Sequence, residues 1–429
     1  METINNTQSR LNLRIFTVKD IEAFVKNRRI LIYGAGRKGI GFCRSLERNG
    51  FKVYGFIDKS PLIAEKGIMQ KPCFSAADYF SNIHKKENDY IFTAAVTHRS
   101  SKELNNICHE AGLENEHDFI DANIISPLYP SVDISGVCNL KCIACPRGDT
   151  LHSLHKGGFM SAAVYQKILN KLLQEIPFLS SIELFIWGEP LLNPHLPEIL
   201  EINNKFGVDS SLSTNLNYSK NLEASVKAGF SNMLIACSGY GKENYEVTHT
   251  GADWNVFYNN LLLLSEYIKK YNSPLVPVIF YFVTKKNIAE YKDIYELCKK
   301  LKFRLFISPY LLFADYILDY AEGNEICPAA KKASDLMLVH PNKWLELMRK
   351  EQNKRCFNYR AFPNIGWDGA VYACCNISRG GGGGLHRTIW TYLWMNLLSA
   401  EIIRLYARIV LNILYTGMNT VYSRNMRLS

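Results

Sequence analysis

Three cysteines lie close enough together in the sequence to hold one iron–sulfur cluster. Cys138, Cys142 and Cys145 form the pattern C-x3-C-x2-C. They follow a short apolar stretch, Val132 to Ile134, that predicts a strand, and they precede a polar loop. A [4Fe–4S] cluster normally takes four cysteine thiolates. A loop that offers three thiolates therefore leaves one iron open to another ligand.

Two other interpretations of these cysteines remain open. A zinc site needs four ligands and commonly takes its cysteines in C-x2-C pairs. No second pair lies nearby, so His152 or His155 would have to complete such a site. Chance clustering is the other alternative, because the chain contains twelve cysteines. Neither alternative explains the motifs that follow downstream.

The segment around the cysteines, residues 132–146 (VDISGVCNLKCIACP), resembles the radical SAM enzymes. The resemblance implies that S-adenosylmethionine chelates the open iron. Reductive cleavage then gives methionine and a 5′-deoxyadenosyl radical, which abstracts hydrogen from a peptide, sugar or nucleotide-sugar substrate. A low-potential flavodoxin or ferredoxin is implied as the electron donor. The cofactor carries the difficult chemistry in such enzymes, and the protein supplies position and shielding.

Further motifs of that family follow the next predicted strands. The sequence W-G-E-P at residues 187–190 stands where the family usually has Gly-Gly-Glu, with Trp187 in place of the first glycine. By the resemblance, the residues that bind S-adenosylmethionine are Gly188, Glu189, Pro190, Ser213, Asn215 and Ser238. A carboxylate suits the cationic amine of this cofactor, because charge-assisted hydrogen bonds are strong. A strand-ending turn at 187–190 and helix caps at 213–215 are the structural alternatives.

The cysteine motif needs a scaffold, and the sequence predicts a parallel sheet for it. Strand candidates lie at residues 131–135, 181–187, 208–214, 232–238, 277–284 and 304–308. Amphipathic stretches between them, such as 162–176, 220–228 and 288–301, predict helices. Six strand–helix units predict a parallel sheet, and the resemblance implies a partial (β/α)6 TIM-type barrel. Barrel chemistry sits at the C-terminal ends of the strands, which is where the cysteines fall.

A second α/β unit precedes the predicted barrel. Gly34, Gly36 and Gly39 form G-x-G-x-x-G between a strand at 29–33 and a helix that runs to about residue 49. Asp58 lies 22 residues after Gly36, at the end of a strand at 53–57, and a third strand is predicted at 90–94. This pattern is typical of a Rossmann-like dinucleotide site, with the glycines near a phosphate and the acid near a ribose hydroxyl.

The N-terminal unit is only half the size of a full dinucleotide domain. It resembles the short nucleotide-binding domains at the front of several polysaccharide-pathway enzymes. Two expectations stay open for it, a bound nucleotide or nucleotide-sugar and a docking or scaffold role without a ligand. The fold alone does not decide between them.

The C-terminal third resembles the opening of a SPASM domain, which follows the barrel in many radical SAM enzymes. Cys356 and Cys374 form C-x12-G-x4-C, and Asp368-Gly369 between them is a hairpin signal. The resemblance implies that these two cysteines bind an auxiliary iron–sulfur cluster. Two unrelated cysteines beside a hairpin are the alternative.

The sequence changes character after this segment. No cysteine follows Cys375, and five glycines at 380–384 precede a tail that contains arginines but no lysine. We interpret the change as a frameshift at a run of glycine codons, which would cut the SPASM domain short. An amphipathic helix over residues 402–414 that lies on a partner or a membrane surface is the alternative.

The expected fold class is α/β, with a Rossmann-like unit, a partial (β/α)6 barrel and a small cysteine-containing extension. The predicted segments are 1–125 (Rossmann-like), 126–315 (barrel), 316–379 (SPASM-like) and 380–429 (atypical tail), with a linker at 122–130. Pro127 and Pro130 interrupt helix formation in that linker.

Composition limits the expected location and partners. The chain has 429 residues, 47% of them apolar, and a net charge of +10 that is spread along the sequence and so disfavours a nucleic-acid partner. We find no signal peptide and no stretch of about 20 apolar residues that would span a bilayer. We therefore expect a cytoplasmic protein with reduced thiols. Four of the cysteines are expected to be buried in the core, namely Cys43, Cys108, Cys237 and Cys298.

Functions of two other classes remain alternatives to the radical SAM interpretation. The Rossmann-like unit is compatible with an NAD-dependent oxidoreductase that carries a structural metal. The chain is also compatible with an inactive scaffold in a surface-polysaccharide pathway. Iron, zinc and NAD content discriminate between these alternatives.

Overall fold

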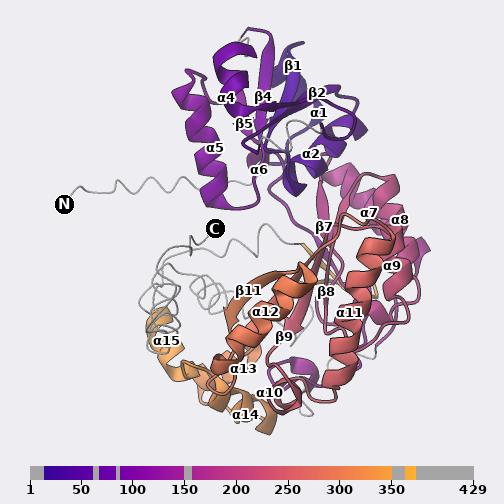
Figure 1. Ribbon diagram of the computed structural model, residues 1–429, viewed down its shortest axis with the longest axis vertical. Coiled ribbons are helices and arrows are strands. Elements are labelled where there is room, and N and C mark those ends of the chain that lie inside the picture. The colour runs from indigo at the N-terminus through magenta and orange to yellow at the C-terminus, as the bar shows by residue number, and fades with distance from the viewer. Residues whose placement is uncertain (1–13, 61–66, 84–86, 149–156, 350–362, 373–429) are drawn as a thin grey trace, which may run out of the picture.

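The computed structural model describes residues 14–60, 67–83, 87–148, 157–349 and 363–372 (Figure 1). These residues form two sheets, each with helices packed on it. The strand orders are β3-β2-β1-β4-β5 in the first sheet and β11-β10-β9-β8-β7-β6-β12-β13 in the second. Every pairing is parallel except that of β12 with β13. The expected α/β class with parallel sheets is confirmed.

The first sheet has the strand order of a doubly wound α/β fold. Its strands are β1 (Arg29–Tyr33), β2 (Val53–Asp58), β3 (Cys73–Ser75), β4 (Asp89–Thr93) and β5 (Phe119–Asp121). Its helices are α1 (Val18–Val25), α2 (Arg37–Arg48), α4 (Ala76–Asp78), the π-helical turn η1 (Tyr79–Ile83), α5 (His98–Glu110) and α6 (Ala122–Ile125).

Both faces of the first sheet are covered, as a parallel sheet requires. On β1, Ile30 and Ile32 pack into a core with α1 and α2, whereas Leu31 and Tyr33 pack into a second core with α5. The period of two along a strand sends successive side chains to opposite faces, so the apolar run RILIY supplies both cores.

The second sheet contains six parallel strands whose spatial order equals their order in the chain. They are β6 (Ser131–Val132), β7 (Ser181–Glu183), β8 (Asp209–Thr214), β9 (Asn232–Cys237), β10 (Val276–Val283) and β11 (Arg304–Pro309). The covering helices are α7 (Ala162–Glu175), α8 (Leu196–Lys205), α9 (Leu222–Ala228), α10 (Lys242–Thr248), α11 (Trp254–Lys270) and α12 (Tyr291–Leu301), with the 3-10 turns η2 (Pro146–Gly148), η3 (Pro190–Leu192) and η4 (Ile288–Glu290). This repeat and order are those predicted for a partial (β/α)6 barrel.

A C-terminal extension follows the second sheet and adds to its β6 edge. It contains α13 (Ala314–Glu322), α14 (Pro328–Leu336), α15 (Pro341–Arg349), β12 (Asn364–Ile365) and β13 (Val371–Tyr372). β12 pairs with β6 in parallel and with β13 in an antiparallel hairpin. The predicted hairpin around Asp368-Gly369 is therefore confirmed.

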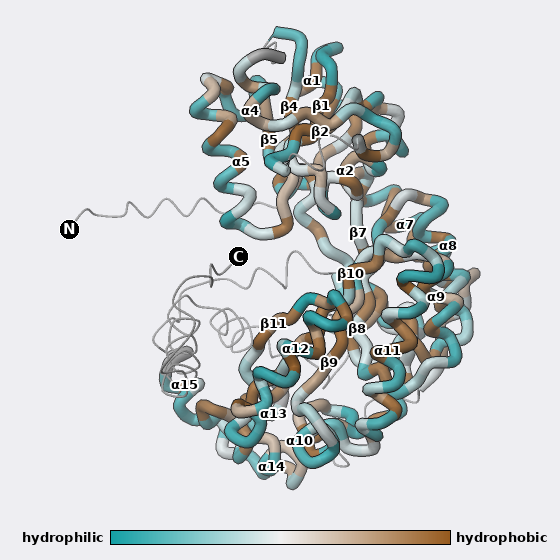
Figure 2. Tube along the Cα trace, viewed as in Figure 1, coloured by the Kyte–Doolittle hydropathy of each residue, from teal (hydrophilic) through white to brown (hydrophobic). Residues whose placement is uncertain are grey.

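The core of the second sheet lies between its strands and its helices. On β10, residues 277, 279, 281 and 283 are buried, and the alternate residues are only half-buried. Figure 2 shows the same division, with hydrophobic colour along the central strands and mixed colour on the helices around them. The half-buried alternate residues mark a second face of the sheet that the helices do not cover.

Two predicted strands are shorter than expected. The strand expected at 131–135 ends at Val132, and the strand expected at 181–187 ends at Glu183. Beyond β7, the backbone N–H groups of Ile186, Trp187 and Gly188 donate to the carboxylate of Asp133 and not to a neighbouring strand. Each of these three bonds is 3.0–3.3 Å long.

The linker predicted at 122–130 is also corrected. Its first four residues form α6, which the Asp121 side chain caps by accepting the N–H of Asn123 at 2.8 Å. Ala122 and Ile125 are buried in the core of the N-terminal unit. The two prolines do not indicate this cap, and the connecting segment is only about 126–130.

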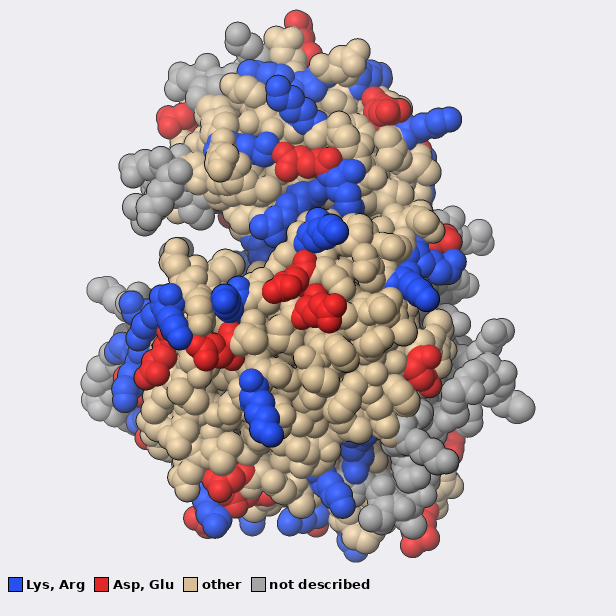
Figure 3. All heavy atoms as spheres, turned by 90° about the vertical axis from the view of Figure 1, so that its right-hand side faces the viewer, with Lys and Arg blue, Asp and Glu red and all other residues tan. Residues whose placement is uncertain are grey.

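The N-terminal unit is firmly attached to the second sheet through α2. Arg48 donates hydrogen bonds of 2.8–2.9 Å to the carbonyl oxygens of Phe206, Pro177 and Leu179. Phe178 is 1% exposed and packs in the core of the N-terminal unit. Figure 3 shows basic side chains at the waist between the two parts of the molecule.

Replacement of Arg48 by leucine is expected to weaken this attachment. Burial lowers the pKa of Arg48 to about 10, and the variant would leave three carbonyl groups without their charged donor. We expect a loss of about 2–4 kcal/mol in the free energy of unfolding, measured by urea denaturation. Lys102→Leu, at an exposed position of α5, is the control. Equal stability of the two variants would contradict the attachment by Arg48.

None of the helices in the described part of the chain has the length and apolar character needed to cross a membrane.

Candidate active site at the three-cysteine loop

The three cysteines lie on the loop that follows β6, at the C-terminal end of the parallel strands. The backbone of this loop is tied to its neighbours by hydrogen bonds from Lys141 N to Thr250 O (2.9 Å) and from Ile143 N to Thr248 O (3.2 Å). A third bond, from Gly136 N to Gly158 O (2.7 Å), holds its start. The loop is therefore fixed to the segment after α10 and to the segment before α7.

The three thiols are partly buried and influence one another. None of them forms a disulfide. Burial raises the pKa of Cys138 to about 12 and raises the pKa of Cys142 well above its ordinary value, and the nearby thiols Cys138 and Cys145 add to the shift at Cys142. Thiolates gathered in such surroundings need a cationic centre to offset their charge. The donor set thus fits an iron–sulfur cluster.

The fourth ligand that a zinc site would need at this loop is His152 or His155. Within the residues that the structure describes, no three Cys, His, Asp or Glu side chains converge on a point where one ion could be held. In a cluster each thiolate binds a different iron, so the ligating sulfur atoms stand farther apart than the ligands of one zinc ion. The alternative zinc ligands His152 and His155 lie outside the described residues.

The turn at Gly188 packs directly against the cysteine loop. A Cβ atom at Gly188 would lie 1.6 Å from the carbonyl oxygen of Ser135, so only glycine fits there. The next residue, Glu189, donates its backbone N–H to Val137 O at 2.8 Å. The structure therefore brings the predicted Gly188-Glu189-Pro190 motif to within one residue of Cys138.

The Glu189 carboxylate is buried and fully engaged with the protein. One oxygen accepts hydrogen bonds from Leu191 N (3.1 Å) and Thr214 Oγ1 (2.7 Å), and the other accepts from Asn215 N (2.8 Å). Burial raises its pKa to about 7. Glu189 thereby joins the end of β7 to the end of β8, and the adjacent Pro190 starts the turn η3.

Asn215 makes the contact between β8 and the cysteine loop. Its Nδ2 atom lies 3.0 Å from Asn139 Oδ1 and 3.6 Å from the sulfur of Cys138. The backbone N–H of Leu140 approaches the same sulfur at 3.5 Å. Such N–H groups tune the reduction potential of a cluster that the sulfur binds. Ser213 is half-buried on β8, opposite Leu234 of β9.

Ser238 contributes to the site through its neighbours. It is 1% exposed, and its hydroxyl contacts Thr248 and lies 2.9 Å from His249 Nδ1. Of these two residues, Thr248 also holds the cysteine loop, because its carbonyl oxygen accepts the N–H of Ile143. The predicted contact with S-adenosylmethionine stays a prediction for Ser238, whereas its role in the structure is to anchor the segment at 248–250.

The C-terminal extension covers the start of the cysteine loop. The indole ring of Trp367, in the β12–β13 hairpin, lies where Cβ atoms on Gly136 or Gly158 would stand, at 2.3 and 2.1 Å. These two glycines thus leave room for the ring. The predicted auxiliary-cluster ligands Cys356 and Cys374, the glycine run and the tail all lie outside the described residues.

The glycine motif of the N-terminal unit lies away from the cysteines. Gly34 has a φ of +110°, and a Cβ at Gly39 would stand 1.9 Å from Gly34 O, so both glycines permit the close turn between β1 and α2. The Asp58 carboxylate accepts N–H bonds from Ala35 and Ser60, each at 2.8 Å. Asp58 therefore holds the glycine loop, and its predicted ribose contact stays a prediction.

Comparison with known proteins gives remote structural similarities. No family model matches the chain, and no curated protein matches it. It is similar to the structure of Streptococcus suis SuiB bound to S-adenosylmethionine (13% identity, TM-score 0.42, 73% of this chain and 74% of that chain). It is also similar to native anSMEcpe with bound AdoMet (19% identity, TM-score 0.39, 58% of this chain and 75% of that chain). A third similar structure is BtrN in complex with AdoMet and 2-DOIA (16% identity, TM-score 0.33, 65% of this chain and 85% of that chain). At these values the function must be argued from the site itself.

Three residues at the site were not singled out from the sequence. Asp133 holds the Gly188 turn, Trp367 covers the loop, and Arg147 donates from Nε to Trp187 O at 2.7 Å. A signal existed for two of them, since Asp133 is an acid inside an apolar stretch and Arg147 directly follows the cysteine motif. Trp367 is separated from the loop glycines Gly136 and Gly158 by more than 200 residues in the sequence, so no local sequence pattern predicts this contact.

Mild acid is expected to loosen the anchor of the cysteine loop. Burial lowers the pKa of His249 to about 4, from the ordinary 6.5 of the unfolded chain. The unfolded state therefore binds more protons between these values, and stability falls as the pH falls from 6.5 to 4. We expect a loss of about 2 kcal/mol between pH 7 and pH 5 from this residue.

Urea denaturation of the wild type, His249→Asn and His195→Asn at both pH values checks this. His249→Asn should reduce the dependence on pH, whereas His195→Asn, at a surface position, should retain it. The same dependence in all three proteins would exclude His249 as its source.

Proposed function

We propose that the chain is a radical SAM enzyme whose cluster is held by Cys138, Cys142 and Cys145. The observation that carries the proposal is the convergence of three separate motifs on one loop. The thiols, the Gly188-Glu189 turn and Asn215 come from the ends of β6, β7 and β8, and they are joined by direct hydrogen bonds or backbone contact. Such convergence at the C-terminal ends of parallel strands is where barrel enzymes place their chemistry.

Each part of the site has a separate task in this proposal. The three thiolates hold the cluster, and the N–H groups of Leu140 and Asn215 stabilise the charge on Cys138. When bound, the cluster supplies one electron for the cleavage of S-adenosylmethionine to methionine and a 5′-deoxyadenosyl radical. The Gly188 turn and the end of β8 border the open side of the loop and would position the cofactor. Asp133 and Glu189 hold these segments in place.

The substrate is proposed to lie on the face of the second sheet that the helices leave open. There Phe280 and Phe306 stand with ring centroids 4.7 Å apart, and Phe306 is 52% exposed. Phe282, 5.0 Å from Phe280, continues this surface toward the cysteine end of the strands. An apolar wall excludes water, which a radical reaction requires. A peptide and a sugar-type molecule both remain candidate substrates, and a flavodoxin or ferredoxin is the proposed electron donor.

Anaerobic reconstitution tests the proposed function. The full chain is incubated with iron and sulfide and then with dithionite and S-adenosylmethionine, and 5′-deoxyadenosine is quantified by chromatography. Formation of 5′-deoxyadenosine with about four irons per chain at the loop is the expected result. Zinc in place of iron, together with tight NAD binding, would replace the proposal by the oxidoreductase alternative. A folded chain that binds neither iron nor zinc would leave the scaffold alternative.

A further inference from the structure

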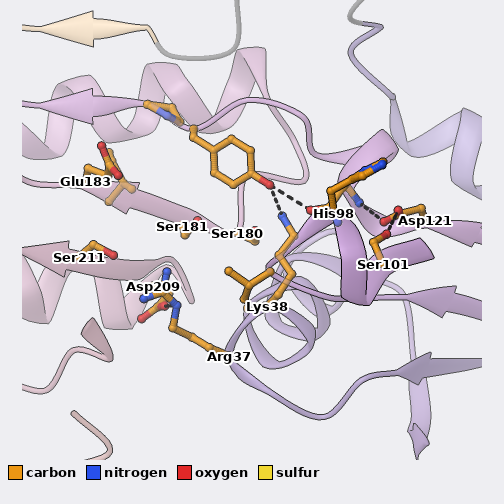
Figure 4. A pocket seen from close by; sticks show the side chains of 16 residues that line it. Arg37, Lys38, His98, Ser101, Asp121, Ser180, Ser181, Glu183, Asp209 and Ser211 are labelled. Atoms are coloured by element: carbon orange, nitrogen blue, oxygen red, sulfur yellow. Dashed lines mark hydrogen bonds and ion pairs between the residues drawn. The ribbon is translucent and has the colours of Figure 1, made fainter. Parts of the chain in front are cut away.

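A cavity of about 440 Å³ lies between the N-terminal unit and the second sheet (Figure 4). One wall is made by the start of α2, the start of α5 and the segment after β5. The other wall is made by the starts of β7 and β8. Its lining residues include Arg37, Lys38, His98, Asp121, Glu183 and Ser211. The cysteine loop lies at the opposite end of β7 and β8, so this cavity is separate from the proposed active site.

The cavity coincides with the position where doubly wound sheets bind their ligands. In the order β3-β2-β1-β4-β5, the chain adds β2 and β3 on one side of β1 and β4 and β5 on the other side, so the parallel neighbours β1 and β4 form the point where the strand order switches. The segments that leave these two strands diverge there and open a crevice at their carboxyl ends. Here the starts of β7 and β8 close the crevice from outside, so both parts of the molecule would contact a ligand in it.

Lys38 is a buried cation without an ionic partner in this cavity. It is 8% exposed, and in Figure 4 it extends from α2 into the middle of the cavity. Within the part of the chain that the structure describes, its ammonium group has one hydrogen bond, 3.3 Å long, to the phenol oxygen of Tyr129, and it lies 4.9 Å from the centroid of the Tyr129 ring. Among the described residues it forms no ion pair with a carboxylate. Burial lowers its pKa to about 8, and the charge of Asp121 only partly opposes this.

The acidic groups in the cavity are already engaged elsewhere. Asp121 contacts the hydroxyl of Ser101 and caps α6. Glu183 accepts from Ser131 at 2.8 Å. Asp209 pairs with Arg37 at 3.3 Å. Lys38 therefore has no ion-pair partner in the described part of the chain, and a buried ammonium without a paired charge is costly to keep.

The N-terminus of α2 adds a second positive element beside Lys38. The helix has twelve residues, its N-cap residue Gly36 provides no side-chain cap, and its first turn contains no acid. A Cβ at Gly36 would meet no atom within 4 Å, and the first two residues of the helix, Arg37 and Lys38, line the cavity. The helix dipole and the unpaired N–H groups of a first turn favour a bound anion, a phosphate in particular.

We propose that this cavity binds a small phosphate ester, with its phosphate between Lys38 and the start of α2. The remainder of the ligand then faces Ser181, Glu183 and Ser211 of the second sheet, whose oxygens suit the hydroxyl groups of a polyol or sugar. The volume accommodates a ligand of this class. The site goes beyond the proposed radical chemistry, because a phosphate ester bound here would contact both parts of the chain at a distance from the cysteines.

Binding of inorganic pyrophosphate to the full chain tests the proposal. Titration calorimetry and thermal denaturation are carried out with the wild type, Lys38→Met, Lys38→Arg and Lys102→Met. Lys38→Met is expected to weaken pyrophosphate binding about 10- to 100-fold, since a charge-assisted bond is lost. The same variant should be more stable than the wild type without ligand, because methionine fills the space without a buried charge. Lys38→Arg should retain most of the binding, and Lys102→Met all of it.

Several results would overturn the proposal. Equal affinity of the wild type and Lys38→Met is one, and absence of any pyrophosphate or inorganic phosphate binding is another. Malonate binding as tight as pyrophosphate would replace the phosphate by a carboxylate ligand. Cys142→Ala separates this site from the proposed function, because the variant should bind pyrophosphate normally while it fails to form 5′-deoxyadenosine.

Discussion

Replacement of Cys142 by alanine is expected to abolish the formation of 5′-deoxyadenosine by the reconstituted chain. The loop provides three thiolates, and two cannot hold a cluster that needs at least three protein ligands and one open iron. Loss of a residue that merely supports a metal ligand already costs about 10- to 100-fold. We therefore expect a loss of more than about 100-fold for a ligand itself, together with a large fall in bound iron.

Cys298→Ala is the matched control for this experiment. Cys298 is 3% exposed and lies on α12, in the core of the second sheet and away from the loop. Its replacement removes one buried thiol and should cost about 1 kcal/mol in stability, with iron content and activity retained. Unchanged iron and 5′-deoxyadenosine in Cys142→Ala would refute the assignment of the cluster to this loop. Equal losses in both variants would point to a general folding defect.

The sequence predicted the sheets well because their strands carry a strong periodic signal. β1 was placed at its observed bounds, and β8, β9, β10 and β11 were each placed to within a residue or so at either end. Their apolar runs and alternations are local properties that need no knowledge of the fold. The buried positions of Cys43, Cys108, Cys237 and Cys298 are confirmed for the same reason.

The contacts that assemble the site could not be read from local patterns. The carboxylate of Asp133 accepts the backbone N–H groups of the turn after β7, a contact that the sequence does not indicate. Ser238 and Glu189 were predicted as cofactor contacts, and in the structure their side chains bind other protein groups. Which partner a polar side chain finds depends on segments far away in the chain. Periodicity carries no such information.

The start of the linker between the two units also could not be predicted from local sequence patterns. Pro127 and Pro130 correctly mark a break in helix formation, but the break is shorter than the nine residues that the composition suggested. Ile125 is 2% exposed and belongs to the core of the N-terminal unit, which exists only when that unit folds. The burial of α6 in the core of the N-terminal unit therefore determines where the linker begins.

Replacement of Gly188 by alanine is expected to disable the site while the two sheets remain folded. The added Cβ would lie 1.6 Å from Ser135 O, whereas real Cβ contacts are not shorter than 3.0 Å. The turn and the start of the cysteine loop must therefore separate by about 1.4 Å or more, which is the difference between these two distances. A misplacement of about 1 Å at an active site costs about 100-fold in rate, and the strain costs about 1–3 kcal/mol in stability.

Gly36→Ala is the matched control, because its added Cβ meets no atom within 4 Å and its φ of −79° suits any residue. Iron content, 5′-deoxyadenosine formation and urea denaturation are measured for both variants. Loss of activity in Gly188→Ala, with Gly36→Ala unchanged, would tie the chemistry to the contact between the turn and the cysteine loop. Full activity in Gly188→Ala would mean that the loop tolerates the displacement, and that the Gly188 turn does not position the cofactor. The tight contact itself makes this test decisive, since the clash is with backbone atoms that no side-chain rotation can relieve.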